Sequence, residues 1–550
     1  MELRINRLPG YHAPSATIDR VLRDRNAQWG KKIFLTWLQT GSTLSYRQLD
    51  ELTLRVGAGI TAAGVSARGH IGVFMNNCPE QLLGILGPAR AGFVSVPLNA
   101  AARGQLLAYF LDHADCVALI VEEELLPHFL EIREQVPRVR HVFVARPDRE
   151  RKAESTPQPA DITLHEFTSL TTAPAALSGE SPDFKDLAML MFTSGTTGPS
   201  KAIMYTHAQF VYWGMDVAHH HEYTSDDVAY VFLPLFHGNA LLGSTMGSLM
   251  SGAAIALAPR FSVNRFWTHI RSSGATVFNG VGAVTNFLWK LPPSPTDRDH
   301  AVRRCHLAPV PSFAHEFEAR FGMTVMSAFG LTDYCLGAAY NTTSPRGKLG
   351  SCGQARAGVE IRIVDEDDFD VSPDTPGEIV LRNNNPWGAS LGYYKQAEAT
   401  AASRRNMWFH TGDRGRMDED GYLWYTDRIK DAIRRRGENI SAFEVEEVIR
   451  THPAVDDVAV YPVCAETSED EVAATITLRP GAAESFSYES LLIHCSRNLA
   501  YFMVPRYVQV TQKMPATLSQ KIEKYKLRRE AEADLSALWD RERSGVQVTR

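Results

Sequence analysis

The sequence lacks the features that mark secreted, zinc-binding and membrane-spanning proteins. Its seven cysteines are scattered over 550 residues without a Cys-x-x-Cys pair, so neither a disulfide framework nor a zinc site is expected. No apolar run approaches the ~18 residues of a membrane span, and the N-terminal residues contain no cationic segment followed by an apolar one. These absences predict a cytoplasmic protein with reduced thiols and no membrane span.

An excess of positive charge is also missing. The net charge is −6 at pH 7 and no long basic stripe occurs, which gives no electrostatic reason to expect a nucleic-acid partner. Hydrophobic residues make up 44% of the chain and charged residues 22%, as in ordinary globular proteins. A chain of this length can form a large core and more than one domain.

Short apolar strands alternate with helices in the first part of the chain. Ser45 and Gln48 form a capping box, and apolar residues follow them at helical spacing. A further helix is expected to open at Pro79 and another to be capped by Asn264. Buried strands are predicted at residues 70–75, 93–96, 118–121, 187–192, 228–233, 253–257, 276–279 and 323–326. This alternation predicts an α/β fold with doubly wound, mostly parallel sheets, interrupted by a surface excursion over the Pro-, Ser-, Thr- and Ala-rich segment 150–183.

The pattern changes in the last third of the chain. Between about residues 349 and 425, strands of period two alternate with Gly, Pro, Asp and Asn turns, which predicts a small β-barrel-like region. Beyond it, strands are predicted at residues 456–463, 472–478 and 506–510, and helices at residues 443–450 and 487–498. We therefore expect a large N-terminal domain over 1–427 and a small, mobile α+β domain over 428–550.

A loop rich in glycine and hydroxyl side chains occupies residues 193–201, Thr-Ser-Gly-Thr-Thr-Gly-Pro-Ser-Lys, directly after an apolar run. Its small residues leave backbone N–H groups accessible and Lys201 adds a point cation, which favours a phosphate-binding loop over a simple surface turn. The spacing of Gly195 and Gly198 differs from that of a Walker A motif, and Ala202 stands where Ser or Thr would bind magnesium. The loop therefore predicts nucleotide binding, but not in the manner of a P-loop kinase.

Four further stretches carry polar groups suited to a nucleotide site. They are residues 329–333 (FGLTD), 408–413 (WFHTGD), 427–431 (DRIKD) and 515–522 (PATLSQKI). Asp333 beside a triphosphate would favour Mg²⁺, whereas alone it would be expected to cap the following helix. Asp413 is suited to accept hydrogen bonds from ribose hydroxyls. Taken singly, the charged run at 427–431 and the lysine of 515–522 would be solvated surface.

In their order and spacing, these five motifs resemble those of the adenylate-forming enzymes, which include acyl-CoA synthetases, peptide-synthetase adenylation domains and beetle luciferases. The resemblance covers nearly the whole chain, from the helix after Ser45 to Lys521. It implies that the β- and γ-phosphates of ATP are bound by Thr193, Ser194, Gly195, Thr196, Thr197 and Lys201. It also implies that Thr332 contacts the α-phosphate and that Asp333 is a ligand of Mg²⁺.

The resemblance further assigns the ribose contacts and a mobile lysine. Asp413 and Arg428 would hold the ribose, and Lys430 would be the hinge of the C-terminal domain. Lys521 would contact the substrate carboxylate and the α-phosphate during adenylation. Negative charge builds up on the α-phosphate and on the departing pyrophosphate, and the Mg²⁺ ion, this lysine and the loop donors would oppose it.

A second conformation is implied for transfer of the acyl group to coenzyme A. Gly437 would line the pantetheine tunnel, arginines 434–436 would bind the CoA phosphates, and His237 would gate the acyl site. Besides the aspartate at 333 in place of glutamate, two positions depart from the family pattern. Gln520 replaces a glycine, and residues 306–309 (HLAP) replace a small Gly-Ala pair against adenine. None of these changes removes a charge that the reaction needs.

The resemblance thus implies an ATP-dependent, AMP-forming acyl-CoA ligase that forms an acyl adenylate before the CoA thioester. Three segments look most like the crotonobetaine/carnitine-CoA ligase branch: residues 292–300, 306–309 and 501–507. A carnitine-like acid and a small aromatic or alicyclic acid both stay open. The expected acyl pocket has an apolar and aromatic lining from Trp213, Met215, His237, residues 278–283 and the surroundings of Gly330. Loading of a carrier-protein thiol and non-catalytic ligand binding are the alternatives, and a homodimer is compatible with the sequence.

Overall fold

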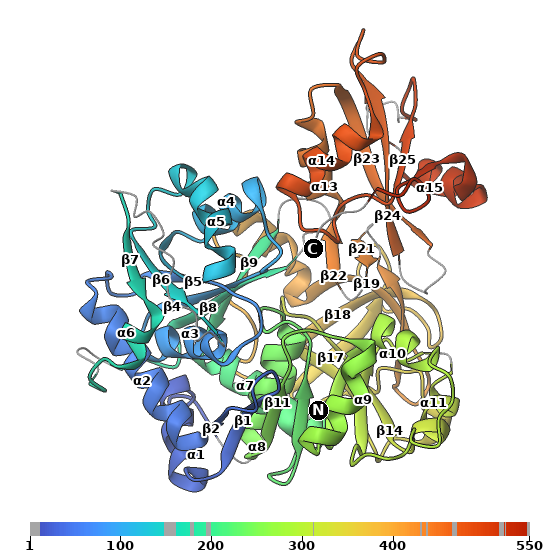
Figure 1. Ribbon diagram of the computed structural model, residues 1–550. Helices are drawn as coiled ribbons and strands as arrows, with labels where there is room; N and C mark the ends of the chain where they lie inside the picture. Colours follow the sequence, from blue (N-terminus) through green and yellow to red (C-terminus); the bar gives the residue numbers. More distant parts are fainter. Residues whose placement is uncertain are drawn as a thin grey trace.

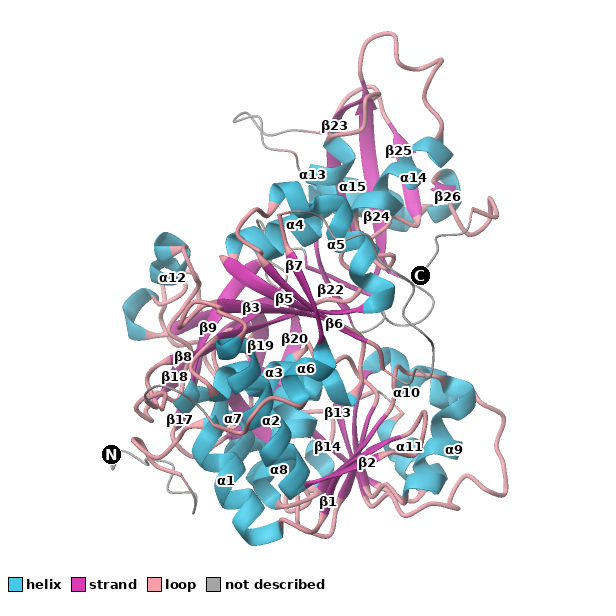
Figure 2. Ribbon diagram, turned by 60° about the vertical axis from the view of Figure 1, so that its left-hand side comes forward, coloured by secondary structure: helices cyan, strands magenta, loops and turns pink. Residues whose placement is uncertain are grey.

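Two large sheets, a small curled sheet and a C-terminal lobe make up the molecule (Figure 1). The computed structural model describes residues 11–147, 161–176, 181–193, 200–311, 313–428, 432–435, 438–464, 470–515, 522 and 524–546. The C-terminal lobe stands at the top of Figures 1 and 2, above the two large sheets.

The first large sheet has nine strands. In spatial order they are β16 (Gln354–Ala355), β15 (Leu336–Tyr340), β14 (Thr324–Gly330), β13 (Arg304–Ala308), β12 (Val277–Val281), β10 (Val228–Val231), β11 (Ala254–Leu257), β1 (Ile33–Trp37) and β2 (Thr43–Ser45). The strands from β14 to β1 pair in parallel. Antiparallel strands complete both edges.

The second large sheet has seven strands. In spatial order they are β7 (Thr163–Glu166), β6 (His141–Ala145), β5 (Cys116–Glu122), β3 (His70–Phe74), β4 (Val94–Leu98), β8 (Leu187–Thr193) and β9 (Lys201–Thr206). All of its pairings are parallel except the hairpin of β8 and β9. The prediction of an α/β fold with mostly parallel sheets is therefore confirmed.

Helices lie between and around these sheets. The α-helices of this part are α1 (Ile18–Trp29), α2 (Tyr46–Ala62), α3 (Pro79–Arg90), α4 (Gly104–His113), α5 (Leu126–Ile132), α6 (Phe167–Thr171), α7 (His207–His220), α8 (Gly247–Ser251), α9 (Val263–Ser273), α10 (Gly282–Trp289), α11 (Ala314–Phe321) and α12 (Ala397–Ala402), and a π-helix, η3, spans Asn239–Met246. The predicted capping box is present at the start of α2, where Ser45 and Gln48 bond reciprocally. Figure 2 shows α2, α3 and α7 between the two large sheets, and one core cluster contains buried residues of both sheets and of these helices.

The predicted barrel-like region is a curled antiparallel sheet of β17 (Val359–Val364), β18 (Gly377–Asn383), β19 (Phe409–Met417) and β20 (Leu423–Arg428). The C-terminal lobe then combines strands with helices as predicted. It contains the hairpin of β21 (Ala432–Arg435) and β22 (Glu438–Ser441), the strands β23 (Val455–Cys464), β24 (Asp470–Leu478), β25 (Tyr507–Val510) and β26 (Trp539–Asp540), and the helices α13 (Ala442–Arg450), α14 (Tyr488–Asn498) and α15 (Lys524–Ala533). The domain boundary at 427/428 stays a prediction.

Two local predictions are wrong. Segment 150–183 is more than a surface excursion, because β7 within it extends the seven-stranded sheet and Phe167 and Leu170 of α6 are buried. Asn264 does not cap α9, which already begins at Val263. Both errors have the same cause. Polar residues were taken to mark the end of a helix or sheet, whereas tertiary packing extends the helix or sheet through them.

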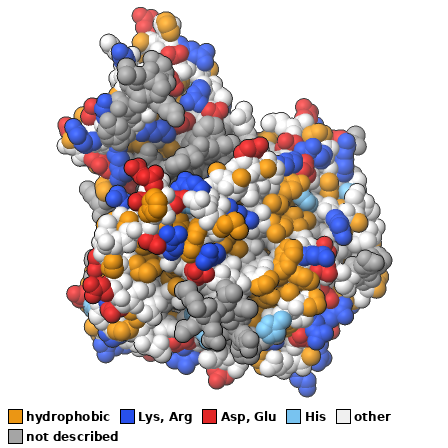
Figure 3. Space-filling model, turned by 180° about the vertical axis from the view of Figure 1, so that it is seen from behind, with side chains coloured by type: hydrophobic (Ala, Val, Ile, Leu, Met, Phe, Trp, Pro, Cys, Tyr) orange, Lys and Arg blue, Asp and Glu red, His pale blue; other side chains and the backbone are white. Residues whose placement is uncertain are grey.

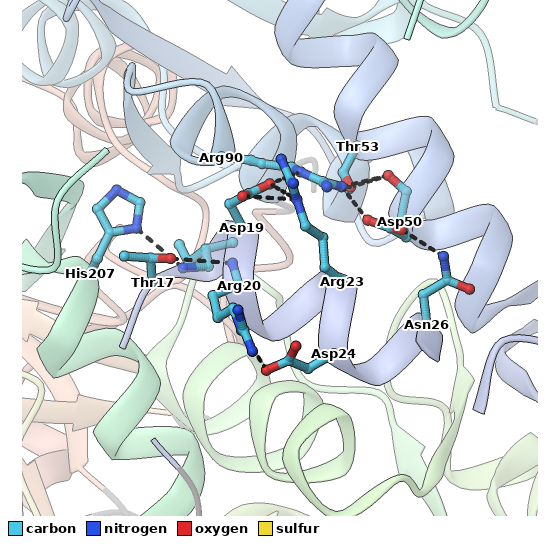
Figure 4. A network of polar contacts seen from close by, with 11 residues as sticks. Thr17, Asp19, Arg20, Arg23, Asp24, Asn26, Asp50, Thr53, Arg90 and His207 are labelled. Carbon is cyan, nitrogen blue, oxygen red and sulfur yellow. Dashed lines mark hydrogen bonds and ion pairs between the residues drawn. The ribbon is translucent and has the colours of Figure 1, made fainter. Parts of the chain in front are cut away.

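A buried ion network ties α1 to the helices between the sheets (Figure 4). The Arg90 side chain, at the end of α3, is 1% exposed. Its Nε donates to Asp19 at 2.7 Å and its Nη1 donates to the Asp50 carboxylate at 2.6 Å. Charge-assisted hydrogen bonds of this kind are stronger than neutral ones, so this arginine fixes α1 and α2 against α3.

The surface mixes charged and hydrophobic side chains, and the cysteines are not cross-linked. On the face seen in Figure 3, positive and negative side chains are interspersed with hydrophobic ones. Among the described residues, no helix combines the length and the apolar character needed to cross a membrane. All seven cysteines carry free thiols.

Candidate active site

The predicted phosphate-binding loop connects β8 to β9. The two strands form a hairpin whose last pair is Thr193 with Lys201, so the loop's first and last residues lie side by side. Lys201 Nζ lies 4.4 Å from the centroid of the Tyr393 ring, a cation–π distance that positions the ammonium group at the base of the loop. Four residues with predicted phosphate contacts lie outside the described part of the chain: Ser194, Gly195, Thr196 and Thr197.

Asp333 lies in the turn between β14 and β15, directly beside Tyr393. The Tyr393 hydroxyl donates to Asp333 Oδ2 at 2.8 Å, and the Ser390 hydroxyl donates to the Asp333 carbonyl. Burial and the adjacent carboxylate raise the pKa of Tyr393, so its hydroxyl stays a donor. The chain continues from this turn into β15 rather than into a helix, and the interpretation of Asp333 as a helix cap is wrong. Tyr393 instead joins Asp333 to Lys201.

The Asp333 carboxylate suits a magnesium ion of the kind that accompanies nucleotides. Such ions take one or two carboxylates and complete their coordination with phosphate oxygens and water. Because Oδ2 accepts the bond from Tyr393, Oδ1 is the oxygen suited to the ion. Within the described ranges, no group of three His, Cys, Asp or Glu side chains could hold a metal by itself. A metal at this turn would therefore be shared with the phosphates of a nucleotide.

Thr332 is held from two sides. The buried Tyr205 hydroxyl donates to the Thr332 carbonyl at 2.5 Å. A Cβ atom on Gly238 would lie 2.9 Å from Thr332 Oγ1, so only glycine fits there without displacing the threonine. Gly238 follows His237, and this close approach brings two of the predicted site residues together.

The two residues with predicted ribose contacts are neighbours. Asp413 and Arg428 are direct backbone partners across β19 and β20. Asp413 is 4% exposed, and its N–H donates to Thr411 Oγ1 at 3.0 Å. The Arg428 side chain and the predicted hinge, Lys430, lie outside the described part of the chain. The ribose contacts stay a prediction.

His237 meets a carboxylate from the C-terminal lobe. His237 Nε2 and Glu438 Oε2 of β22 lie 2.5 Å apart, and the two side chains are 35% and 15% exposed. The hairpin of β21 and β22 therefore lies beside His237, the predicted gate of the acyl site. Sequence reasoning missed Glu438, whose only signal is a carboxylate directly after Gly437 in the run RRRGENI.

A second carboxylate of the lobe contacts the end of the loop. Glu444 of α13 accepts hydrogen bonds from the Ser200 N–H at 2.6 Å and from the Ser200 hydroxyl. The Tyr109 hydroxyl donates to the Ser200 carbonyl at 2.8 Å. Burial raises the pKa of Glu444 to about 7, although the two bonds from Ser200 lower it. Glu444 therefore titrates near neutrality while it is bonded to the last N–H before Lys201.

One of the predicted contacts with CoA is wrong. The Arg435 side chain is 2% exposed, forms an ion pair with Glu471 at 2.6 Å and donates to the Phe502 carbonyl at 2.8 Å. These partners hold the guanidinium inside the lobe, where it cannot bind a CoA phosphate. Arg434 donates to the Ala308 carbonyl at 3.3 Å, which links the lobe to the nine-stranded sheet. Three other predicted site residues lie outside the described part of the chain: Arg436, Gly437 and Lys521.

Two residues predicted to line the acyl pocket, Phe278 and Asn279, are buried in the structure. Phe278 is 1% exposed and belongs to the core cluster formed with α9 and α11, so its side chain packs on those helices. Its neighbour Asn279 is the register partner of His306. The His306 ring stacks on His221 with the ring centroids 3.7 Å apart. Buried polar side chains therefore lie beside the strand that was predicted to line the acyl pocket.

Comparisons with known proteins agree with this geometry. The family model described as AMP-binding enzyme matches residues 22–394, and the AMP-binding enzyme C-terminal domain matches residues 444–521. A crotonobetaine/carnitine–CoA ligase of Salmonella heidelberg (strain SL476) is 28% identical over 491 residues, which cover 88% of this chain and 93% of that protein. The o-succinylbenzoate CoA synthetase (MenE) of Bacillus subtilis superposes with a TM-score of 0.78 at 23% identity, covering 94% of this chain and 98% of that one. ATP-bound MatB of Rhodopseudomonas palustris superposes with a TM-score of 0.68 at 25% identity, covering 95% of this chain and 99% of that one.

Proposed function

The chain belongs to the AMP-binding enzyme family, among the adenylate-forming acid–thiol ligases, and we propose that it is an ATP-dependent, AMP-forming acyl-CoA ligase. It would join a carboxylic acid to the α-phosphate of ATP with release of pyrophosphate, then transfer the acyl group to the CoA thiol. One observation carries this proposal. Tyr393 contacts both Lys201, at the base of the loop, and the Asp333 carboxylate.

The first half-reaction needs positive charge and hydrogen-bond donors, because attack on the α-phosphate places negative charge on that phosphate and on pyrophosphate. We assign the N–H groups of residues 193–197 and Lys201 to the β- and γ-phosphates, and Thr332 to the α-phosphate. Lys521 would contact the reacting carboxylate and the same phosphate. Asp333 would hold a Mg²⁺ ion, whose charge offsets that of the phosphates.

The ribose would be held next to these groups. Asp413 and Arg428 are paired across adjacent strands, which supports a joint role as a clamp for the two ribose hydroxyls. We propose Lys430, two positions beyond the end of β20, as the hinge for the C-terminal domain over 428–550. A moving domain would exclude water from the acyl adenylate, which water otherwise hydrolyses.

The second half-reaction would use the arrangement in which the C-terminal lobe contacts His237. The bond between Glu438 and His237 supports a state in which the hairpin of the lobe lies at the acyl site. Gly437, next to that glutamate, would line the path of the pantetheine arm. The thiol would then attack the acyl carbon, and AMP would leave.

The identity of 28% with a crotonobetaine/carnitine–CoA ligase does not fix the acid, for which a carnitine-like and a small aromatic or alicyclic compound are both candidates. A panel of carboxylic acids, assayed for pyrophosphate release with MgATP in the presence and absence of CoA, tests the function. We expect AMP formation that depends on CoA, with the acyl-CoA as product. Acylation of a phosphopantetheinylated carrier protein without turnover of CoA would contradict the proposed acceptor. Absence of pyrophosphate release with every acid would contradict the enzyme function.

A further inference from the structure

Four polar side chains form a buried cluster, here called the His–Asn cluster: His221, Tyr223, Asn279 and His306. The Tyr223 hydroxyl donates to Asn279 Oδ1 at 3.2 Å, and its ring lies 5.9 Å from the His221 ring. The His221 ring stacks on His306 at 3.7 Å, and His306 is the register partner of Asn279. None of the four residues is more than 8% exposed.

The cluster lies next to the site residues around Thr332. A Cβ atom on Gly243 of η3 would lie 3.2 Å from Asn279 Nδ2 and 3.7 Å from Asn239 Oδ1. Gly238, at the start of the same helix, packs on Thr332. The two glycines are separated by the i to i+5 span of a π-helical hydrogen bond, and π-helical turns occur frequently at functional sites. Glycine at both positions keeps side-chain bulk out of the space between Thr332 and Asn279.

Several buried polar atoms here have no hydrogen-bond partner among the residues that the structure describes. They are His221 Nδ1, His221 Nε2, His306 Nε2 and Asn239 Oδ1. The His306 ring donates to the backbone of Ser327 through its other nitrogen, which makes Nε2 an acceptor. Because buried polar groups are nearly always hydrogen-bonded, the His306 acceptor in particular points to a ligand that donates to it.

The group that donates to His306 is neutral. Burial lowers the pKa of His306 to about 4 and lowers that of His221 well below its ordinary value, so both imidazoles are uncharged at neutral pH. The nearby charged side chains are paired: Arg304 lies 3.0 Å from Asp227, and Arg356 lies 3.0 Å from Asp216. A second carboxylate or a quaternary ammonium would therefore face uncharged imidazoles and charges that are already paired.

We propose that the His–Asn cluster is the specificity site for the distal part of the acyl group, and that the acid carries a hydroxyl group there. Such a hydroxyl donates to His306 Nε2, which gives this buried acceptor a partner, and accepts from Asn279 Nδ2. This inference rests on the proposed acid activation, because an acyl group joined near Thr332 is what would reach the cluster. Sites built to bond a substrate hydroxyl reject the analogue without it by up to about 10⁴-fold.

The test uses the full-length enzyme and pairs of acids that differ only in one hydroxyl, both aliphatic and aromatic. ATP–pyrophosphate exchange gives kcat/KM for each acid. For the pair of acids with the highest kcat/KM, we expect kcat/KM of the hydroxy acid to exceed that of its deoxy analogue by at least about tenfold. His306→Leu should abolish this preference by lowering kcat/KM of the hydroxy acid alone. His306→Gln, whose amide oxygen can replace Nε2 as acceptor, should retain part of it.

Cys305→Ala is the matched control. Cys305 lies next to His306 on β13, but its side chain belongs to the core cluster formed with α9 and α11 rather than to the His–Asn cluster. This variant should leave the ratio between the two acids unchanged. Two results would overturn the assignment of the cluster. One is a wild-type enzyme whose kcat/KM for the hydroxy acid does not exceed that for the deoxy analogue. The other is a His306→Leu variant that loses kcat/KM equally for both acids. Absence of exchange with every acid is a different result, because it contradicts the proposed function itself.

Discussion

His237 Nε2 and Glu438 Oε2 lie 2.5 Å apart, although 201 residues separate them in the chain. A carboxylate this close orients the imidazole through a strong hydrogen bond. Glu438→Gln keeps the length of the side chain and removes its charge. We expect acyl transfer from a supplied acyl adenylate to CoA to slow about tenfold, the effect of one hydrogen bond. Pyrophosphate exchange should change by less than about twofold, since we assign this contact to the second half-reaction.

Glu447→Gln is the control for that variant. Glu447 is also a glutamate of the C-terminal lobe, but its side chain is 52% exposed and pairs with Arg450 of the same helix. Exposed pairs of this kind contribute little, so both half-reactions should be unaffected. Equal losses in both half-reactions of Glu438→Gln would contradict a role confined to acyl transfer.

Tyr393 contacts both Asp333, the proposed magnesium ligand, and Lys201. Tyr393→Phe keeps the ring beneath Lys201 but removes the hydroxyl bond to Asp333 Oδ2. We expect kcat/KM for MgATP to fall about tenfold, with a higher Mg²⁺ concentration needed for half-maximal exchange. Tyr394→Phe is the control, because the Tyr394 hydroxyl bonds Asp115 instead. An unchanged Mg²⁺ dependence in Tyr393→Phe would argue against Asp333 as a metal ligand.

Glu444 makes the contact of the lobe with Ser200 sensitive to pH. Burial raises the pKa of Glu444 from 4.5 to about 7, so the folded protein holds this proton more tightly than the unfolded chain does. Stability from this group is therefore greatest below about pH 4.5 and declines as the pH rises towards 7. Glu444→Gln keeps the oxygen that accepts from Ser200 and cannot ionise, so its melting temperature should decline less between pH 5 and 8 than that of the wild type. Glu489→Gln, at an exposed position, should follow the wild type, and a Glu444→Gln curve parallel to it would exclude this effect.

The sheets could be predicted from sequence because apolar strands and capping boxes are local signals. Contacts between distant residues could not, since Glu438 reaches His237 only through the placement of the lobe. Predictions from single polar residues failed because they, too, ignored contacts between distant parts of the chain. Asn264 and Asp333 are good helix caps in isolation, yet the fold uses one inside a helix and the other at a turn beside Tyr393.

Lys521 carries the sharpest functional prediction from the family resemblance. Its ammonium group would oppose charge on the α-phosphate only during adenylation, so Lys521→Ala should abolish pyrophosphate exchange. Thioester formation from a supplied acyl adenylate should be largely intact. Lys513→Ala, at an exposed lysine of the same lobe, should affect neither step. Similar losses in both half-reactions of Lys521→Ala would contradict the role assigned to this lysine.

Arg90 offers a test of what holds α1 in place. Arg90→Met fills a similar volume but leaves the carboxylates of Asp19 and Asp50, whose side chains are 10% and 14% exposed, without this cation. Breaking a buried pair in this way costs about 3–5 kcal/mol, which calorimetry should register as a lower melting temperature of the unit that contains α1. Arg20→Met breaks a pair in which the arginine is 62% exposed, and should cost less than about 1 kcal/mol. Adding Asp50→Asn to Arg90→Met should recover part of the loss, because it removes one of the uncompensated charges. If the two arginine variants melted alike, the network in Figure 4 would contribute no more than a surface pair.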